Sequence, residues 1–382
     1  MLLKKIGLVT LYQNNYGSAL QCYALETIIN KLGYDVILLY ESPTAIELSI
    51  RTLKKRLNVL IRSIIYPGYF TDFLSMRNAM KIEQSYLTTE SSKMLRNFVS
   101  TKLIPKTYTW KELKKLGSDD NFKGFVVGSD QVWNVSREIS PFFFLKFAPS
   151  QKRHSYAVSL GVEKVPKYFI NNLKKGINGF SRVSVREYFG KQIIRKYTNI
   201  DVIQNVDPTL LLSAEEWRKF YGHKTLIKER FILVHFLNEP SDLAISKINL
   251  LSDKIGCKVV GFAYYYNKYK QIKNLVFIDG DPKKYIYLID KAQYVLTDSY
   301  HTTIFSINLK TKFYVFHRQY LHNFPQTNRI TELLKKFNLS DKLIKNQEDE
   351  LVEYDFDDEI DNIICHDKDI AMDYLIIEFS GI

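Results

Sequence analysis

The feature that most constrains the fold is an alternation of strand-like and helix-like segments that runs twice along the chain. The first series opens with an apolar, β-rich run at 5–11, helical spacing at 18–32 and a strand pattern at 35–40. A polar, basic linker at 223–230 separates it from a second series, which opens with a strong strand pattern at 231–237. Such alternation predicts an α/β fold with two parallel-sheet domains that face each other across a cleft.

The length of 382 residues also favours two domains, because one hydrophobic core rarely serves a chain of this size. We predict an N-terminal domain at 1–222 and a C-terminal domain at 223–345. An acidic segment and a last helix, beginning near Ile370, are expected at 346–382. Residues from about 45 to 100 interrupt the alternation and are predicted to be a helical insertion in the first domain.

Within this insertion, apolar residues repeat at helical spacing from Ile50 to Ile65, and five basic residues lie among them between Arg51 and Arg62. A basic amphipathic helix can lie on an anionic membrane surface. It can equally cover a protein core with its apolar face. The sequence leaves both interpretations open, so peripheral membrane contact through 50–65 is one of two expectations.

The net charge of +13 is unevenly distributed, because residues 347–361 contain nine acidic side chains and no Lys or Arg. The positive excess of the rest suits an anionic partner, such as a phosphorylated metabolite, a nucleic acid or an anionic lipid surface. No motif typical of nucleic-acid binding accompanies it, so we expect no nucleic acid as partner.

The three cysteines, Cys22, Cys257 and Cys365, are far apart in the sequence and predict neither a disulfide framework nor a zinc site. The apolar run near the start is short and strand-like, and no run approaches a membrane span. We therefore expect a cytoplasmic location, at the inner face of the membrane if the basic helix binds lipid.

Several predicted strands end in polar residues that parallel sheets would bring to one cleft. Asn15 and Gly17 lie where the first helix starts, and free N–H groups there suit an anion. Ser129 and Asp130 end another strand, where a carboxylate can also simply cap a turn. Arg186 ends a third, where it can grip phosphate or carboxylate with two bonds or pair with a neighbouring acid.

The stretch TDSYHTT, residues 297–303, is the most specific of these loops. A strand precedes it and a helix follows, so it offers backbone N–H groups together with the hydroxyls of Thr302 and Thr303. His301 stands at the helix start, where it can be an anion ligand or carry a proton. Asp298 is expected to cap the turn. We predict a phosphate cradle here.

As a set, these loops resemble the polysaccharide pyruvyl transferase family. The matching segments occur in the family's order and are NNYGSALQCYAL (14–25), VVGSDQVWN (126–134), SYAVSLG (155–161), VSVRE (183–187), VDPTLLL (206–212), TDSYHTTIFSI (297–307) and NRITELLKKFNL (328–339). The resemblance does not clearly extend to 45–100 or to the acidic C-terminal segment.

The resemblance implies a glycosyltransferase-B-like architecture of two Rossmann-like domains. It also implies that phosphoenolpyruvate is the donor substrate, with no further cofactor and no metal. Pyruvate would become a ketal on two hydroxyls of a hexose in a cell-surface glycan, which is either free or lipid-linked. His301 would act as general acid or phosphate ligand, Asp130 would orient or deprotonate the acceptor, and Arg186 and Arg329 would hold the donor.

The chain departs from part of the family at two positions. Some branches carry arginine where Ser299 stands, and many carry glycine where Thr302 stands. Arg329, Arg318 or Lys312 can replace the missing cation. Two other functions remain open from the sequence: a glycosyltransferase that uses a nucleotide sugar, and a non-catalytic protein that binds glycans or a lipid surface.

Overall fold

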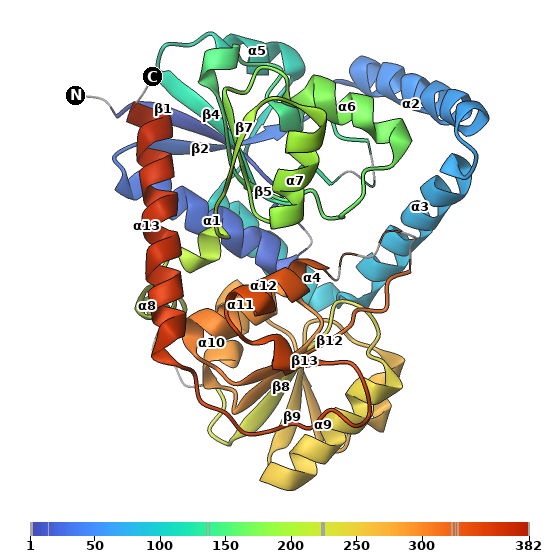
Figure 1. Ribbon diagram of the computed structural model, residues 1–382, viewed down its shortest axis with the longest axis vertical. Helices are drawn as coiled ribbons and strands as arrows, with labels where there is room; N and C mark the ends of the chain where they lie inside the picture. Colours follow the sequence, from blue (N-terminus) through green and yellow to red (C-terminus); the bar gives the residue numbers. More distant parts are fainter. Residues whose placement is uncertain are drawn as a thin grey trace.

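The computed structural model describes residues 3–13, 15–134, 136, 138–222, 226–321, 324, 326 and 328–380 (Figure 1). It contains two parallel sheets with helices on their faces, which confirms the predicted class of two Rossmann-like α/β domains. The first three residues of the predicted linker, 223–225, lie outside the described residues. The predicted domain limits stay predictions.

The first sheet has seven strands in the order β3-β2-β1-β4-β5-β6-β7. Its strands are β1 (Lys5–Val9), β2 (Asp35–Glu41), β3 (Lys106–Tyr108), β4 (Phe122–Asp130), β5 (Arg153–Val158), β6 (Arg182–Val185) and β7 (Asp201–Gln204). The strand order reverses between β1 and β4, which pair in register from Ile6 with Gly124 to Val9 with Val127. The loops that follow these two strands therefore flank the crevice where such sheets bind ligands.

The second sheet has six strands in the order β10-β9-β8-β11-β12-β13. Its strands are β8 (Phe231–His235), β9 (Lys258–Phe262), β10 (Leu275–Ile278), β11 (Tyr294–Thr297), β12 (Phe313–Phe316) and β13 (Leu343–Ile344). Here the order reverses between β8 and β11, so the TDSYHTT stretch leaves the sheet at its own switch point.

The helices that matter for the site connect these strands. They are α1 (Tyr16–Lys31), α7 (Tyr188–Tyr197), α8 (Ala214–Tyr221), α10 (Pro282–Lys291), α11 (Tyr300–Leu309) and α12 (Asn328–Lys336). The remaining helices are α2 (Ala45–Ile65), α3 (Tyr69–Tyr86), α4 (Thr89–Phe98), α5 (Trp110–Gly117), α6 (Lys167–Ile177), α9 (Asp242–Ile255) and α13 (Asp358–Ser380). None of the helices in the described part of the chain is long and apolar enough to cross a membrane.

The start of α1 joins the two domains. The buried Tyr16 ring packs 5.3 Å from the Phe262 ring and 5.4 Å from the Tyr285 ring, and its hydroxyl donates to the Gly280 carbonyl. Asn308 of α11 donates in turn to the carbonyls of Thr209 and Leu212 in the first domain. The facing loops are therefore held at a fixed separation by buried contacts.

The C-terminal helix is longer than predicted. It begins at Asp358 and not near Ile370, because the last residues of the acidic segment fit a helix start, where the helix dipole favours negative charge. It returns to the first sheet, where Tyr374 donates to the Ser155 carbonyl and Glu378 contacts His154 Nδ1 at 2.8 Å (Figure 1).

The insertion forms α2, α3 and α4. None of the residues of α2 is buried, and its apolar stripe points away from the protein. The interpretation in which this stripe covers a core is therefore wrong for the described residues, because the polar side of the helix faces the first domain.

Candidate active site

His301 lies at the start of α11, against the start of α1 from the other domain. Ser299 caps α11, because its side chain accepts a hydrogen bond from the Thr302 N–H and its carbonyl accepts one from the Thr303 N–H. A Cβ atom on Gly17 would lie 2.2 Å from the His301 ring, closer than any real side chain could approach. The absence of a side chain at Gly17 therefore leaves the space that the His301 ring occupies.

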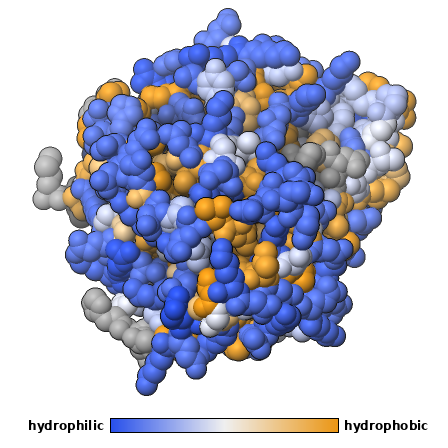
Figure 2. All heavy atoms as spheres, turned by 60° about the horizontal axis from the view of Figure 1, so that its bottom comes forward, coloured by the Kyte–Doolittle hydropathy of each residue, from blue (hydrophilic) through white to orange (hydrophobic). Residues whose placement is uncertain are grey.

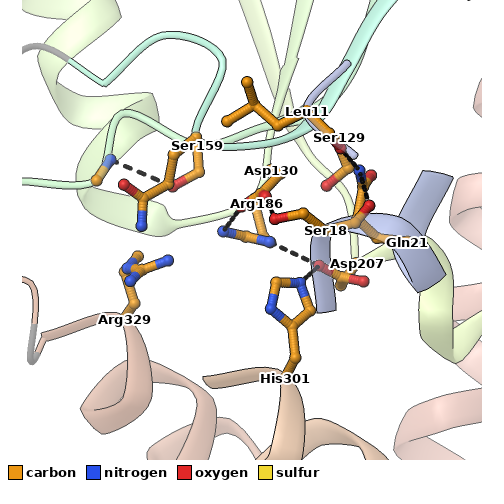
Figure 3. A network of polar contacts seen from close by, with 12 residues as sticks. Leu11, Ser18, Gln21, Ser129, Asp130, Ser159, Arg186, Asp207, His301 and Arg329 are labelled. Atoms are coloured by element: carbon orange, nitrogen blue, oxygen red, sulfur yellow. Dashed lines mark hydrogen bonds and ion pairs between the residues drawn. The ribbon is translucent and has the colours of Figure 1, made fainter. Parts of the chain in front are cut away.

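Asp207 is the centre of the polar network that crosses the domain boundary (Figure 3). Its Oδ2 accepts a 2.6 Å hydrogen bond from Arg186 Nη1 and lies 3.6 Å from His301 Nε2. Its Oδ1 accepts from the N–H and hydroxyl of Thr209. Burial alone would raise the pKa of Asp207, but His301, Arg186 and the Thr209 N–H lower it well below its usual range.

Asp130 is the second carboxylate of the network and ends β4. It accepts a short hydrogen bond from the Ser18 hydroxyl, and its Oδ1 lies 3.7 Å from Arg186 Nη2. Burial opposes ionisation here too, yet the charges of His301 and Arg186 and the Ser18 bond lower the pKa of Asp130. Asp130 is therefore ionised at neutral pH and can accept a hydrogen bond from a ligand hydroxyl.

Arg186 is surrounded on several sides by these acids. Its Nε lies 3.2 Å from Glu187, and its guanidinium lies 4.5 Å from the centre of the Tyr300 ring. Burial would lower the pKa of Arg186, but Tyr300 and the carboxylates of Glu187, Asp207 and Asp130 raise it above its ordinary value. Arg186 was expected either to bind an anionic ligand or to pair with a neighbouring acid, and these contacts are compatible with both roles. It pairs with Asp207 and Glu187, while its Nη2 has no hydrogen-bond partner among the described residues.

Arg329 joins the network from α12 of the second domain. Its guanidinium lies 5.6 Å from the centre of the Tyr300 ring, so Tyr300 contacts both arginines. With the Gln131 amide turned so that its oxygen faces the guanidinium, this oxygen accepts from Arg329 Nη1 at 2.7 Å and from Nη2 at 2.8 Å. Gln131 follows Asp130 directly, so this pair links the end of β4 to the second domain.

Several predicted site residues point their side chains elsewhere. The Thr302 hydroxyl contacts His235 Nδ1 and the Tyr285 hydroxyl, each at 2.8 Å, and the Thr303 hydroxyl donates to the Ser299 carbonyl. Ser129 is fully buried and donates to the Ala157 carbonyl. These three hydroxyls already contact protein groups, and their role as ligands of the substrate stays a prediction.

Asn15 caps α1 by accepting a hydrogen bond from the Ser18 N–H, and it lines the cleft between the domains. Asp298 caps a turn, as expected, since its two oxygens accept from the N–H groups of Leu237 and Asn238. Burial raises the pKa of this carboxyl. Asn15 and Asp298 therefore shape the loops around the network.

Two basic residues remain as substitutes for the arginine that Ser299 replaces. Arg318 lines the cleft and lies 3.5 Å from Asp298, with the nearby Tyr320 and Asp298 raising its pKa against the opposing effect of burial. Lys312 precedes β12, at the opposite end of the sheet, and pairs with Glu353 and Asp355 of the acidic segment. Arg318 is thus near the cleft and Lys312 is not.

Two cavities flank the network. The larger, about 700 Å³, lies between the domains, and its mostly polar lining includes six aromatic residues: Tyr12, Tyr40, Phe142, Phe143, Tyr264 and Tyr320. The smaller, about 490 Å³, lies on the side of α12 and is lined by Arg186, Asp207, Tyr300 and Arg329 together with Lys335 and Lys336. A polyanion and a larger polar molecule could thus both reach groups of the network. Among the described residues, no group of three His, Cys, Asp or Glu side chains could hold a metal ion.

Three contributors were not predicted from the sequence: Asp207, Tyr300 and Gln131. Asp207 lies in the VDPT segment, which repeats the pattern of a polar residue after a strand and could have indicated it. Tyr300 and Gln131 stand next to predicted residues in the chain. Nothing in the local pattern indicates that Gln131 reaches the other domain.

The two facing sheets and the charged boundary between them define a protein of the glycosyltransferase-B-like class. Solved structures with this fold include a protein assigned as a UDP-N-acetylglucosamine 2-epimerase from Listeria monocytogenes, with 8% identity, 100% of this chain and 97% of that chain covered, and a TM-score of 0.52. UGT89C1 of Arabidopsis thaliana has 11% identity, coverage of 99% and 100%, and a TM-score of 0.51. At such low identity the likeness shows the fold alone.

The chain belongs to the polysaccharide pyruvyl transferase family, whose model matches residues 15–320. This range contains Asp130, Arg186, Asp207 and His301, and Arg329 follows shortly after it. No curated protein matches the chain. The expected family membership is confirmed, and with it a role in transfer to polysaccharide.

Proposed function

We propose that this protein transfers the pyruvyl group of phosphoenolpyruvate to two hydroxyls of a hexose, as a ketal, in a polysaccharide or its lipid-linked precursor. The observation that carries the proposal is a pair of buried nitrogen donors at the domain boundary. Arg186 Nη2 and His301 Nε2 both lack a hydrogen-bond partner among the described residues, although Nη2 lies 3.7 Å from Asp130 Oδ1 and Nε2 lies 3.6 Å from Asp207 Oδ2. Unpaired buried donors are costly, and an anionic ligand would satisfy them.

Phosphoenolpyruvate carries about three negative charges near neutrality, so its site must supply cations and N–H donors. Arg186, Arg329 and His301 are the candidates, with Arg318 nearest to the cleft as a fourth. Arg186 now pairs with Asp207 and Glu187. We infer that donor binding replaces part of these ion pairs, which keep the arginine in position while the site is empty.

The chemistry needs one proton delivered and two hydroxyls activated. A protonated His301 would donate to the methylene carbon of the donor, and a sugar hydroxyl would then attack the adjacent carbon. When the second hydroxyl attacks, the bond from that carbon to the phosphate oxygen breaks. Of the two hydroxyl protons, one restores the proton spent on the methyl group and the other leaves with inorganic phosphate.

Asp130 would orient the acceptor, because its lowered pKa keeps it ionised and able to accept a hydrogen bond from a sugar hydroxyl. The aromatic side chains in the lining of the larger cavity suit the apolar faces of a sugar chain, and its polar side chains suit the hydroxyls. His301 can bind phosphate or deliver the proton, and one measurement separates the two roles. Loss of a phosphate ligand raises the KM for phosphoenolpyruvate, whereas loss of the acid lowers kcat.

The first test compares thermal shifts with phosphoenolpyruvate and with a panel of nucleotide sugars. A ligand at 100 times its Kd should stabilise the protein by about 2.7 kcal/mol. A shift with nucleotide sugars alone would overturn the proposed donor in favour of a glycosyltransferase. Binding of phosphoenolpyruvate without phosphate release on any acceptor would favour a non-catalytic role.

The second test replaces the histidine. His301→Ala should reduce phosphate release by about 100-fold or more, in line with the loss of a positioned acid or anion ligand. His366→Ala, on the exposed side of α13, is the control and should leave the rate unchanged. A rate within about twofold of wild type for His301→Ala would contradict its assignment.

A further inference from the structure

The α2 helix is amphipathic but presents its apolar side to solvent. Its 21 residues make it about 31 Å long. Exposed apolar side chains recur along its outer side, among them Leu53 at 69% and Ile64 at 77% exposure. The full set is Ile46, Ile50, Leu53, Leu57, Leu60, Ile61, Ile64 and Ile65, which we call the α2 stripe. Proteins that act as free monomers rarely expose an apolar surface of this extent.

The polar side of α2 holds the helix against the first domain. Arg51 pairs with Glu41 at 2.5 Å, and Arg62 lies 3.7 Å from Glu138 with its guanidinium 5.2 Å from the centre of the Phe169 ring. These contacts fix the rotation of the helix about its axis. The outward direction of the α2 stripe therefore follows from the way the helix is attached.

The apolar surface continues along α3 toward the cleft. Phe70 and Leu74 are exposed at the start of α3, and Met76 and Met80 line the larger cavity farther along. Orange side chains accordingly gather at the right-hand edge of the molecule in Figure 2, where Figure 1 places α2 and α3. At its end α3 meets the second domain, where Tyr265 N–H donates to the Tyr86 carbonyl.

The charge of these helices selects the partner. Residues 45–86 contain seven Lys or Arg and three Asp or Glu, and Lys54 and Arg56 flank the α2 stripe on its two sides. Basic residues beside an outward apolar stripe are the pattern of a helix that lies in the interface of an anionic bilayer. A second copy of this chain would instead bring the same basic residues together on a molecule of net charge +13.

We propose that α2 and α3 form a docking surface for an anionic lipid bilayer, which places the mouth of the cleft at the membrane surface. A glycan attached to a membrane lipid could then enter the cleft while its lipid stays in the bilayer. The bilayer contact stands on the geometry of α2 and α3 alone. Only the lipid-linked glycan rests on the proposed function.

The test measures sedimentation of the full-length protein with vesicles that contain phosphatidylglycerol and with vesicles of pure phosphatidylcholine. The wild type should bind the anionic vesicles, and added salt should weaken the binding. The affinity of the variant L53N/L57N/I64N for these vesicles should be lower by about tenfold or more, because the variant lacks apolar side chains that would enter the bilayer. The matched control L250N/V352N/I377N changes three similarly exposed apolar residues elsewhere and should bind like the wild type.

A second pair of measurements separates this inference from the proposed function. The thermal shift with phosphoenolpyruvate should be the same for wild type and for L53N/L57N/I64N, because the α2 stripe lies outside the network. Absence of that shift in the wild type would sink the donor proposal and leave the vesicle result standing. Wild type that stays in the supernatant with anionic vesicles, or equal binding by the two triple variants, would overturn the docking surface. The docking surface would also be overturned if the wild type were a dimer that binds no vesicles and L53N/L57N/I64N were a monomer.

Discussion

The α11 and α2 helices reverse what their side chains would lead one to expect. All ten residues of α11 are buried, although its sequence YHTTIFSINL contains a histidine, three hydroxyl side chains other than tyrosine and an asparagine. None of the residues of α2 is buried, although its apolar stripe has eight members. The position of each helix relative to the sheets explains this difference. The α11 helix follows β11 at the switch point of the second sheet and faces the first domain, whereas α2 belongs to an insertion outside the alternation.

The buried polar groups of α11 are accommodated because they find partners. Besides the bonds of Thr302 and Thr303, the Ser306 hydroxyl donates to the Thr302 carbonyl, and Asn308 donates to the first domain. His301 is the exception, since its Nε2 has no hydrogen-bond partner among the described residues. A helix whose residues are all buried thus holds one ring nitrogen without a hydrogen-bond partner at the site.

The largest effect is expected from Arg186→Ala. It would leave Asp130, Asp207 and Glu187 buried without their cation, which should reduce the free energy of unfolding by about 3–5 kcal/mol. Urea denaturation measures this loss. Arg182→Ala, at the start of the strand β6 that Arg186 follows, removes an exposed pair with Asp201 and should cost less than about 1 kcal/mol. Equal losses in the two variants would mean that the buried network contributes nothing beyond a surface ion pair.

Glu26 in α1 allows a test, by pH, of what it costs this protein to hold a polar group away from water. Burial raises the pKa of its carboxyl from the ordinary 4.5 to about 7, and its Oε2 has no hydrogen-bond partner among the described residues. The folded state thus binds this proton more tightly than the unfolded state does. Stability should therefore fall as pH rises from about 4.5 to about 7 and stay low above it.

Glu26→Gln should remove this decline, so the variant should gain up to about 3 kcal/mol relative to wild type at pH 8 and little at pH 4. Unfolding by urea at the two pH values gives the comparison. Glu90→Gln, at an exposed position on α4, should show no such dependence on pH. A Glu26→Gln curve parallel to that of the wild type would show that the carboxyl is solvated in the folded state.

Gly17→Ala tests the contact between α1 and α11. The new Cβ would lie 2.2 Å from the His301 ring, so α1 or the histidine must shift, at a cost of about 1–3 kcal/mol and with loss of phosphate release. Gly190→Ala in α7 is the matched control, because the nearest atom to its Cβ would be a Leu160 methyl at 3.3 Å, with Val185 and Glu187 at 3.7 and 3.9 Å. That exchange should be neutral or stabilise by up to about 1 kcal/mol. Full activity in Gly17→Ala would mean that the position of His301 is not critical.

The sequence was sufficient to predict the fold and the strand ends that meet at one crevice, but not the contacts made there. Alternating patterns and the switch-point rule predict that Asp130, Arg186 and His301 lie near one crevice, since each follows a strand. The contact of Asp207 with His301 and that of Gln131 with Arg329 depend on how the two domains meet, which no local sequence pattern encodes. The Thr302 hydroxyl could not be assigned for a similar reason, because its contact with His235 depends on how α11 packs against the sheet.

The smallest effect on stability is expected where the apolar surface is largest. Leu53→Asn should change the free energy of unfolding by no more than about 0.5 kcal/mol, since this side chain is exposed in the folded protein much as in the unfolded chain. Ile304→Asn in α11, at a side chain that is 1% exposed, should cost about 3 kcal/mol or more, because it buries an amide among apolar neighbours. Urea denaturation of both variants makes the comparison.

A Leu53→Asn variant that lost more than about 1 kcal/mol would show that the α2 stripe contributes to the folded protein itself, contrary to the exposure of its residues. If its stability is unchanged while vesicle binding falls in L53N/L57N/I64N, the stripe acts only when a bilayer is present. Stability and binding would then be assigned to different helices: α11 holds polar groups inside the protein to form a site, and α2 holds apolar groups outside it to bring that site to its substrate.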